Sequence, residues 1–287
     1  MQIAVTQVVN GLVLGMLLFL MSAGLSLIFG LMNVVNVAHG SFFMLGAFFA
    51  MTIAERTGDF WLGLALGWIP AVVLGVAMER LFIRYLYART HLDQVLLTFG
   101  FTFVFADLVR MLWGPDIRNM SVPPALEGAV EVMDIILPKY RLFLIAFGGL
   151  IALLLWLFLE RSRVGAMVRA GVDDATTAAG LGIDVQLLFA GIFALGVGLA
   201  AIGGAAAGPV LGVYLGLDGE ILIPAFIVVV IGGLGSLRGA FVSSLLVGLI
   251  DTLGKAYFPD FALFAIYLLM VIVLLTRPHG LFGVGKA

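Results

Sequence analysis

The sequence predicts an all-α, polytopic membrane protein, and its composition supports this fold class in three ways. Hydrophobic residues make up 63% of the 287 residues and charged residues only 11%, whereas soluble domains carry roughly 25% charge. The mean hydropathy is +1.20. Glycine occurs 37 times and proline 9 times, which suits membrane helices whose backbones approach closely. Glycines spaced for such contacts are Gly11 with Gly15, and the series Gly204, Gly208, Gly212 and Gly216.

Apolar runs place the membrane spans, since a helix needs about 20 such residues to cross a bilayer. No Asp, Glu, Lys or Arg precedes Glu55, and the polar break Gly30 to Ser41 (GLMNVVNVAHGS) divides this first stretch into two helices. We expect helices over residues 5–31, 41–54, 60–81, 95–113, 142–159, 185–211, 221–231, 240–254 and 261–276. Several are short, and with tilt or re-entry the total is about eight to ten transmembrane helices.

We interpret residues 1–287 as a single transmembrane domain with an internal repeat. Residues 5–159 form a first helical half with a linking helix, residues 160–184 a polar loop, and residues 185–276 a second helical half. Equivalent helices lie an odd number of spans apart, so two four-helix repeats would be inverted relative to each other. In inverted repeats the transport pathway lies between the halves.

Lysine and arginine near the span ends predict the orientation, because both are enriched in cytoplasmic loops. With the amino terminus outside, nine basic residues fall inside: Arg80, Arg84, Arg89, Arg161, Arg163, Arg169, Arg238, Arg277 and Lys286. Six fall outside: Arg56, Arg110, Arg118, Lys139, Arg141 and Lys255. We therefore expect an outer amino terminus, a cytoplasmic carboxyl terminus and a cytoplasmic central loop.

The central segment, Glu160 to Asp184, is the long polar interruption of an otherwise apolar chain. Asp173 and Asp174 favour a helix start, and Gly180 and Gly182 favour a helix end. Small residues between them form a flat face: Ala175, Ala178 and Ala179. This segment is either an ordinary cytoplasmic loop or a short helix that fits into a groove on another protein.

The break between the first two helices carries polar groups: Asn33, Asn36, His39 and Ser41. Irregular backbone inside a membrane is tolerated only where it lies within protein or lines water, so these groups could contact a solute. The alternative is structural, with the asparagines capping helix ends and His39 bonding to a carbonyl. A second break, Gly232 to Gly239 (GGLGSLRG), either forms a tight turn or serves function.

Two charge pairs and one outer loop complete the polar features. Asp107 with Arg110, and Asp251 with Lys255, are spaced to pair on one helix face, and we interpret both as anchors near outer helix ends. The loop from Gly114 to Tyr140 either connects two spans or contacts an external partner.

The sequence favours no enzyme and no bound cofactor. The chain has no cysteine, which excludes disulfides and thiolate metal sites. The tail GLFGVGKA has the glycine and lysine spacing of a phosphate-binding loop, but Ala287 replaces the Ser or Thr that would bind magnesium. We expect no catalytic residue, metal ligand or ATP site in this chain.

Three segments carry a resemblance to one transporter family: NVVNVAHGSFFMLGAF, RAGVDDATTAAGLGI and VVVIGGLGSLRGAFVSSLLVGLIDTL. The chain resembles the permease subunit of branched-chain (hydrophobic) amino acid ABC importers, over nearly its whole length and in the same order. The first motif, with Asn36, Ala38, His39 and Gly40, is the most specific, and it favours the H-type subunit over its M-type sister.

The resemblance implies a transport subunit of the bacterial inner (cytoplasmic) membrane that is not itself an enzyme. Its partners would be an M-type permease in a heterodimer, two cytoplasmic ATPases that hold ATP and magnesium, and a periplasmic substrate-binding protein. No nucleic-acid partner and no cofactor on this chain are expected. The transported solute would be a branched-chain or hydrophobic amino acid.

The resemblance also assigns residues. The family's ATPase-contacting loop maps onto Arg169, Ala170, Asp173, Asp174, Ala178, Gly182 and Ile183, while Gly171, Val172 and Gly180 depart from it. ATP-driven closure of the ATPases would push a coupling helix at Asp174 to Gly180 and switch the access of the pathway. The candidate substrate-pathway residues are Asn33, Asn36, His39, Gly40 and Ser41.

Other functions stay open at this point. An ion-coupled secondary transporter would need a titratable residue or ion cage at the membrane midplane, and none is apparent in the sequence. A channel for urea or another small neutral solute would need no energy source. Within the importer interpretation, urea and short-chain amides are alternative substrates.

Overall fold

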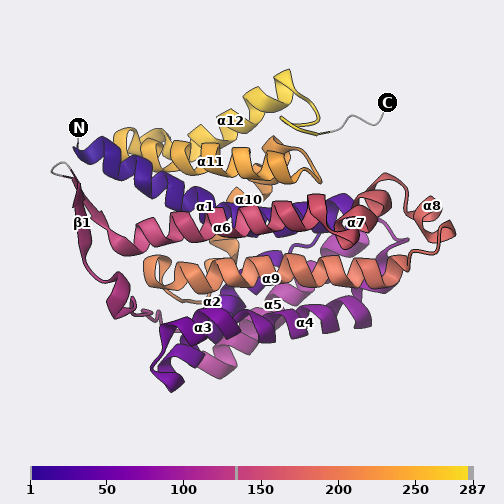
Figure 1. The fold of residues 1–287 in the computed structure, drawn as a ribbon, viewed down its shortest axis with the longest axis horizontal. Coiled ribbons are helices and arrows are strands. Elements are labelled where there is room, and N and C mark those ends of the chain that lie inside the picture. The colour runs from indigo at the N-terminus through magenta and orange to yellow at the C-terminus, as the bar shows by residue number, and fades with distance from the viewer. Residues whose placement is uncertain (1, 133–134, 284–287) are drawn as a thin grey trace.

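The protein is a bundle of membrane-length helices, described for residues 2–132 and 135–283 of a computed structural model. Within these residues, six helices are long and apolar enough to cross a membrane. Their bounds are Ala4–Met32, Phe60–Leu81, His91–Trp113, Lys139–Arg161, Val185–Leu211 and Leu237–Tyr257. With three further helices of 19, 16 and 15 residues, they confirm the all-α, polytopic fold class (Figure 1).

The helices follow one another along the chain with mostly short connections, except for the longer loop of residues 114–138 between α5 and α6. Their bounds are α1 Gln2–Met32, α2 His39–Thr57, α3 Phe60–Leu66, α4 Trp68–Leu81, α5 His91–Trp113, α6 Lys139–Arg161, α7 Arg163–Asp173, α8 Ala175–Gly180, α9 Val185–Leu211, α10 Leu217–Gly232, α11 Leu237–Tyr257 and α12 Ala262–Thr276. Short 3-10 turns are η1 Ile83–Leu86, η2 Pro124–Leu126 and η3 Pro259–Phe261. Strands β1 Ala129–Val132 and β2 Ile135–Pro138 form an antiparallel hairpin in the loop before α6.

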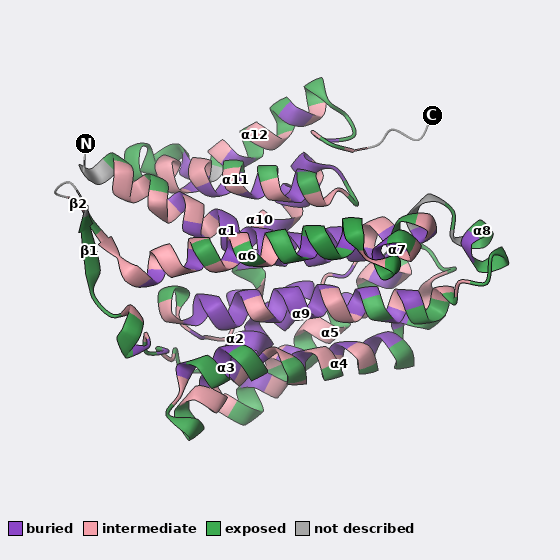
Figure 2. Cartoon of the chain, in the orientation of Figure 1, coloured by how far each residue is buried: buried purple, intermediate pink, exposed green. Residues whose placement is uncertain are grey.

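The centre of the bundle consists of α1, α2, α9 and α10, most of whose residues are buried, as the purple of α9 shows in Figure 2. Five phenylalanine side chains are fully buried here: Phe19, Phe42, Phe43, Phe48 and Phe193. Because α2 and α10 are surrounded by other helices, their lengths of 19 and 16 residues need not match the bilayer.

The outer helices carry large apolar side chains on their exposed faces. On α5, α6 and α12 these include Phe103, Leu112, Leu153, Leu268 and Leu275. Apolar surface of this extent would drive association or aggregation in water, whereas lipid chains cover it at no cost. The distribution is that of a multi-pass membrane protein, with a packed interior and a lipid-facing rim.

Glycine allows the central helices to touch backbone to backbone. A Cβ on Gly46 of α2 would collide with the carbonyl of Ala201 in α9. The same collision would occur between a Cβ on Gly204 of α9 and the carbonyl of Phe43 in α2. The crossing of α2 and α9 therefore depends on the absence of side chains at both positions.

The glycine spacings in the sequence are confirmed in part as contact points. Gly11 and Gly15 of α1 pack directly on α11, as a GxxxG spacing predicts. Of the longer series, Gly212 and Gly216 lie beyond the end of α9. Their φ values of 79° and 106° shape the connection to α10 instead.

The packing of the two helical halves is consistent with an inverted repeat. The helices α1 and α9, the first of each half, contact each other and run in opposite directions (Figure 1). α1 packs on α11, and α9 packs on α4. Each half thus presents its first helix to the third span of the other half, as an inverted repeat would.

We expect Gly46→Val to destabilise the protein by about 1–3 kcal/mol, because the added side chain separates α2 from α9. The measurement is the thermal unfolding midpoint of the detergent-solubilised protein, followed by size-exclusion fluorescence. Gly100→Val in α5 is the matched control, since a Cβ there meets nothing within 4 Å. Equal midpoints for the two variants would contradict the packing argument.

Candidate functional site

The central polar segment folds into two short helices, α7 and α8, that project at one end of the bundle (Figure 1). Ser162 caps α7, since its hydroxyl accepts the N–H of Gly165 at 2.9 Å. Asp174 caps α8, and one carboxylate oxygen accepts the N–H groups of Thr176 at 2.9 Å and Thr177 at 3.1 Å. The predicted helix start at Asp174 and end near Gly180 are thereby confirmed.

The cap also fixes the charge of Asp174. The hydroxyl of Thr177, followed by the backbone N–H groups of Thr177 and Thr176, lowers the pKa of the Asp174 carboxyl below its ordinary value. A lowered pKa means that the capping contribution is present above the unfolded-state pKa and is lost only as the pH falls through the folded-state pKa. Near neutral pH, α8 therefore begins with a negative charge at its N-terminus.

The residues assigned to ATPase coupling differ in exposure. Arg169, Asp174 and Gly182 are exposed, and Ala170 and Ile183 are half-buried. Asp173 ends α7, and the placement of its side chain lies outside the description. Ala178 differs from expectation, because it is only 2% exposed.

The flat face of small residues is therefore not wholly open to a partner. The i to i+3 and i to i+4 geometry of so short a helix turns Ala178 toward its own chain, while Ala179 stays exposed. The large exposed side chain is Leu181, directly after α8, with 78% of its surface open. No pattern in the sequence distinguishes this residue from other leucines.

Leu181 stands at the edge of an apolar cavity of about 670 Å³. The cavity lies between α4, α6, α7 and α9, and its lining includes Val164, Met167, Ile183 and Leu187. Val164 and Leu187 are exposed apolar side chains as well. Small helices, an acidic cap and an apolar edge thus occur together at this end of the bundle.

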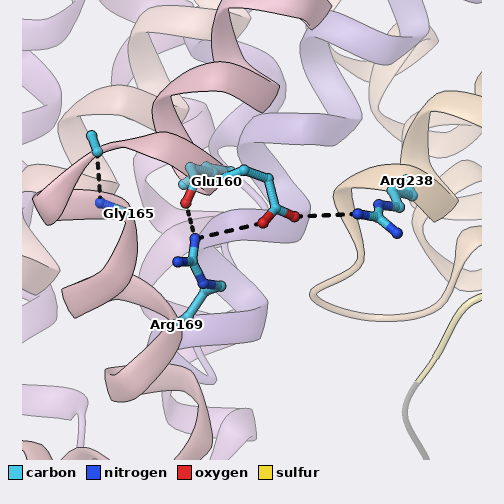
Figure 3. A network of polar contacts seen from close by, with 6 residues as sticks. Glu160, Gly165, Arg169 and Arg238 are labelled. Atoms are coloured by element: carbon cyan, nitrogen blue, oxygen red, sulfur yellow. Dashed lines mark hydrogen bonds and ion pairs between the residues drawn. The ribbon is translucent and has the colours of Figure 1, made fainter.

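A shared carboxylate connects this segment to the bundle (Figure 3). Glu160, at the end of α6, lies 3.4 Å from Nη2 of Arg238 on α11 and 3.9 Å from Nη1 of Arg169 on α7. Arg169 also donates to the carbonyl of Leu159. The sequence predicted a role for Arg169 but not its contact with Glu160. It also did not predict the contact between Glu160 and Arg238, because α6 and α11 meet only in the folded structure.

The polar break between α1 and α2 is held by side chains from α5. The backbone N–H of Val35 donates to Oε1 of Gln94 at 3.3 Å, and that of Val37 donates to Oγ1 of Thr98 at 3.1 Å. Asn33 adopts a positive φ of 51° where the chain leaves α1 and is exposed. The break therefore has specific partners for donors that the unwound backbone leaves free.

Three candidate pathway residues at the start of α2 make close contacts. Nε2 of His39 lies 3.2 Å from the carbonyl oxygen of Met21. This is the contact with a carbonyl that a structural role for His39 predicts. Ser41 donates to Oδ2 of Asp218 at 3.0 Å. A Cβ on Gly40 would lie 2.5 Å from the carbonyl oxygen of Asp218, so only glycine allows α10 to approach this closely.

Asp218 is a polar residue of this site that the apolar runs of the sequence do not predict. The predicted helix began at Ile221, whereas α10 begins at Leu217 and places Asp218 in its first turn. The signal that could have found it is Gly216 followed by two acidic residues, which favours a helix start. The hydrogen bond from Ser41 to Asp218 therefore connects the break to the first turn of α10, the second helix of the second half.

Asn36 has a different environment from its neighbours. It is fully buried, and neither of its amide atoms has a hydrogen-bond partner among the described residues. The Nδ1 atom of His39 and the hydroxyl of Ser26 are buried without partners there as well. A buried amide without partners is costly, and such groups call for an explanation beyond stability.

The second break and the charge pairs have structural partners. The carboxyl-terminal segment covers the second break, with the N–H groups of Leu281 and Phe282 donating to the carbonyls at the end of α10. Lys255 and Asp251 form the predicted pair at 2.7 Å. Within residues 2–132 and 135–283, no ion pair joins Asp107 to Arg110, so that anchor is not observed. Ala287 lies outside the described residues.

A lipid-facing helical bundle, with a polar break in its centre and a polar arm (α7 and α8, residues 163–180) at one end, is the architecture of a multi-pass membrane protein. The chain matches, over residues 7–274, the family described as the permease component of branched-chain amino acid transport systems. The chain therefore belongs to this permease family.

Individual relatives cover almost the full chain. It is 28% identical over 302 residues to the high-affinity branched-chain amino acid transport system permease protein LivH of Escherichia coli, covering 96% of this chain and 94% of LivH. It is 28% identical over 293 residues to the corresponding protein BraD of Pseudomonas aeruginosa, covering 96% and 95%. A probable permease protein LivH of Methanocaldococcus jannaschii is 26% identical over 293 residues, covering 93% and 89%. No solved structure matches the chain.

We expect Asn36→Leu to maintain or raise the thermal unfolding midpoint while it lowers solute uptake. Removing an unpartnered buried amide relieves a penalty of about 1–3 kcal/mol, but it also removes a group that could bind a solute. Thr276→Leu, at an exposed position at the end of α12 and outside the break, is the control and should change neither quantity. A lower midpoint for Asn36→Leu would assign the amide a structural role.

Proposed function

We propose that this chain is the H-type permease subunit of an ATP-driven importer that moves branched-chain or hydrophobic amino acids by alternating access. The family supports the permease role, and the names of the relatives, as branched-chain amino acid permeases, support the substrate class. The observation that carries the coupling is the α7–α8 arm, which has an acidic cap and an exposed Leu181.

The proposed partners are a second, M-type permease, two cytoplasmic ATPases and a periplasmic binding protein. ATP and magnesium reside on the ATPases, and this chain binds no cofactor of its own. The arm supplies the contact: Leu181 enters an apolar groove of an ATPase, and the negative N-terminus of α8 faces a basic surface there. An apolar anchor surrounded by polar groups is the usual composition of a protein interface.

The proposed orientation has the amino terminus outside and the arm in the cytoplasm of a bacterial inner membrane. Basic residues at the arm's end of the bundle support it, since they come from α4, η1, α6, α7 and α11. These residues are Arg80, Arg84, Arg161, Arg163, Arg169 and Arg238. Enrichment of arginine on one side is typical of cytoplasmic ends.

The proposed pathway passes the break between α1 and α2, where the two halves meet. In the present conformation Asn36, His39 and Ser41 are fully buried, so access at the break is closed. A push on the arm moves α9, which follows the arm directly and packs on α2 through glycine. Movement of α2 against α10 would then expose the polar groups of the break.

We expect Asp174→Arg and Leu181→Asp each to abolish co-purification of the ATPase subunits with the permease. The first change inverts the charge at the start of α8, and the second introduces a charge into an apolar contact. The measurement is the amount of ATPase recovered on the tagged permease from cells that express all subunits. Asp260→Arg is the matched control and should retain the ATPases. Asp260 lies in η3, which follows the end of α11 that is remote from the arm.

Asp174→Arg also removes the N-cap of α8, which by itself disturbs this short helix. Asp174→Ser separates the two effects, because serine caps a helix without a negative charge. Normal recovery of the ATPases in both Asp174→Arg and Leu181→Asp, together with normal uptake, would overturn the coupling proposal.

Leucine uptake into proteoliposomes that hold the complete complex tests the energy source. We expect uptake to require ATP inside the vesicle, where the ATPases of complexes oriented for import into the lumen lie, and to be unaffected by an uncoupler. Uptake that survives removal of ATP and collapses with an uncoupler would indicate an ion-coupled transporter. Flux without any energy source would indicate a channel, and uptake of urea or amides but not leucine would change the substrate class.

A further inference from the structure

Two adjacent cavities open at the end of the bundle opposite the arm. One has a volume of about 430 Å³ and the other about 340 Å³. Both are lined by Leu14 of α1, Val210 and Leu211 of α9, and Asp251 and Lys255 of α11. Each volume falls within the roughly 300–1,000 Å³ of small-molecule sites. On the proposed orientation, this is the outer face.

Charges of both signs converge on these cavities from different helices. The first cavity is lined by Arg141, at the start of α6, together with Asp251 and Lys255. The second is lined by Glu220, in the first turn of α10, together with the same pair. Opposite charges gathered from three helices around these two adjacent cavities could hold a charged solute.

The ion pair of Asp251 with Lys255 does not use all the hydrogen-bonding groups around the cavities. Asp251 is only 8% exposed, and its Oδ2 lies 2.7 Å from Nζ of Lys255, whose side chain is 60% exposed. Arg141 donates from Nη1 to Oδ1 of Asn10 and has no carboxylate partner among the described residues. A guanidinium has five donors in a planar fork that suits a carboxylate.

Glu220 is held as an acceptor in the second cavity. The hydroxyl of Tyr214 donates to its Oε2 at 2.7 Å. Burial, followed by the hydrogen bond to Glu220, raises the pKa of Tyr214 to about 12. The tyrosine therefore stays protonated and keeps donating at ordinary pH.

The remaining walls are largely apolar, with Gln7, Asn10 and Thr252 as the other polar residues of the first cavity and Tyr214 as that of the second. The first cavity adds Val13 and Leu17 of α1, and the second adds Leu18, Ile221 and Val247. A site with fixed charges of opposite sign on one part of its wall and branched aliphatic side chains on the rest fits one chemical class. That class is a zwitterion with an apolar side chain.

We propose that the two cavities form an outer subsite for a hydrophobic α-amino acid, in which Arg141 binds the substrate carboxylate and Asp251 binds the substrate ammonium. Lys255 supports the carboxylate from the rim, and the aliphatic side chain lies against α1 and α9. This inference rests on the proposed function and adds to it a place where the solute is received before the central break opens. The alternative is that Asp251 and Lys255 only anchor the end of α11.

The test measures binding of radiolabelled L-leucine to the complete complex in lipid nanodiscs, without the periplasmic binding protein. Two competitors probe the two charges: 3-methylbutylamine lacks the carboxylate, and 4-methylpentanoate lacks the ammonium. We expect each to compete roughly tenfold or more weakly than leucine, since each loses a charged hydrogen bond.

Two variants should then change selectivity in opposite ways. Arg141→Gln is expected to weaken leucine binding by about tenfold and to leave 3-methylbutylamine unchanged. Asp251→Asn is expected to weaken leucine and 3-methylbutylamine and to leave 4-methylpentanoate unchanged. A merely structural role would weaken all three compounds alike, so the pattern separates recognition from folding.

Three further variants serve as controls. Lys139→Gln and Asp260→Asn remove charges near the two sites without lining either cavity, and should leave every affinity as in the wild type. Arg141→Lys keeps the positive charge, so it should retain the preference for leucine over 3-methylbutylamine.

The outcomes distinguish this inference from the proposed function. A wild-type complex that takes up leucine with ATP, but whose Arg141→Gln and Asp251→Asn variants bind all three compounds as the wild type does, overturns the subsite alone. Uniform weakening of all three compounds also overturns it. A wild-type complex that neither binds leucine nor takes it up overturns the proposed function as well.

Discussion

The crossing of α2 and α9 is the contact on which the rest of the structure depends. The backbones meet at Gly46 and Gly204, and such contacts take the place of the hydrophobic effect, which provides no drive between helices in lipid. α2 begins at the polar break and α9 begins just after the projecting arm. One side-chain-free crossing therefore fixes the position of the arm relative to the break, and a rigid contact can transmit motion between them.

Much of the fold could be predicted from local sequence because membrane helices are specified by length and polarity. The observed α9, Val185–Leu211, has the predicted bounds, and Asp174 caps α8 as its position before a short polar helix suggested. Prediction was weaker where helix ends are polar. The predicted start at Ile221 omitted the first turn of α10, because Asp218 and Glu220 resemble a loop when apolar length alone is counted.

The candidate site was predictable as a location and less so as a set of contacts. The break at Asn36 and His39 was identifiable from polar residues within an apolar stretch, but its partners Gln94, Thr98 and Asp218 lie on helices far along the chain. The exposure of Leu181 and the burial of Ala178 depend on how one turn of helix rotates against the bundle. Asp251 and Lys255 were identified as a pair, yet their position on a cavity required the arrangement of α1, α6, α9 and α10.

The shared carboxylate of Glu160 contributes to the stiffness of the arm. Its two arginines come from different helices, and both contacts are exposed to solvent. An exposed ion pair contributes about 0–1 kcal/mol, which is comparable to thermal energy, so either arginine can release while the other still holds. The Glu160 bridge therefore stiffens the arm only weakly beyond the packing of α7 on α6 and α1, and because salt screens exposed charges over about 8–10 Å near physiological ionic strength, this stiffening decreases as ionic strength rises.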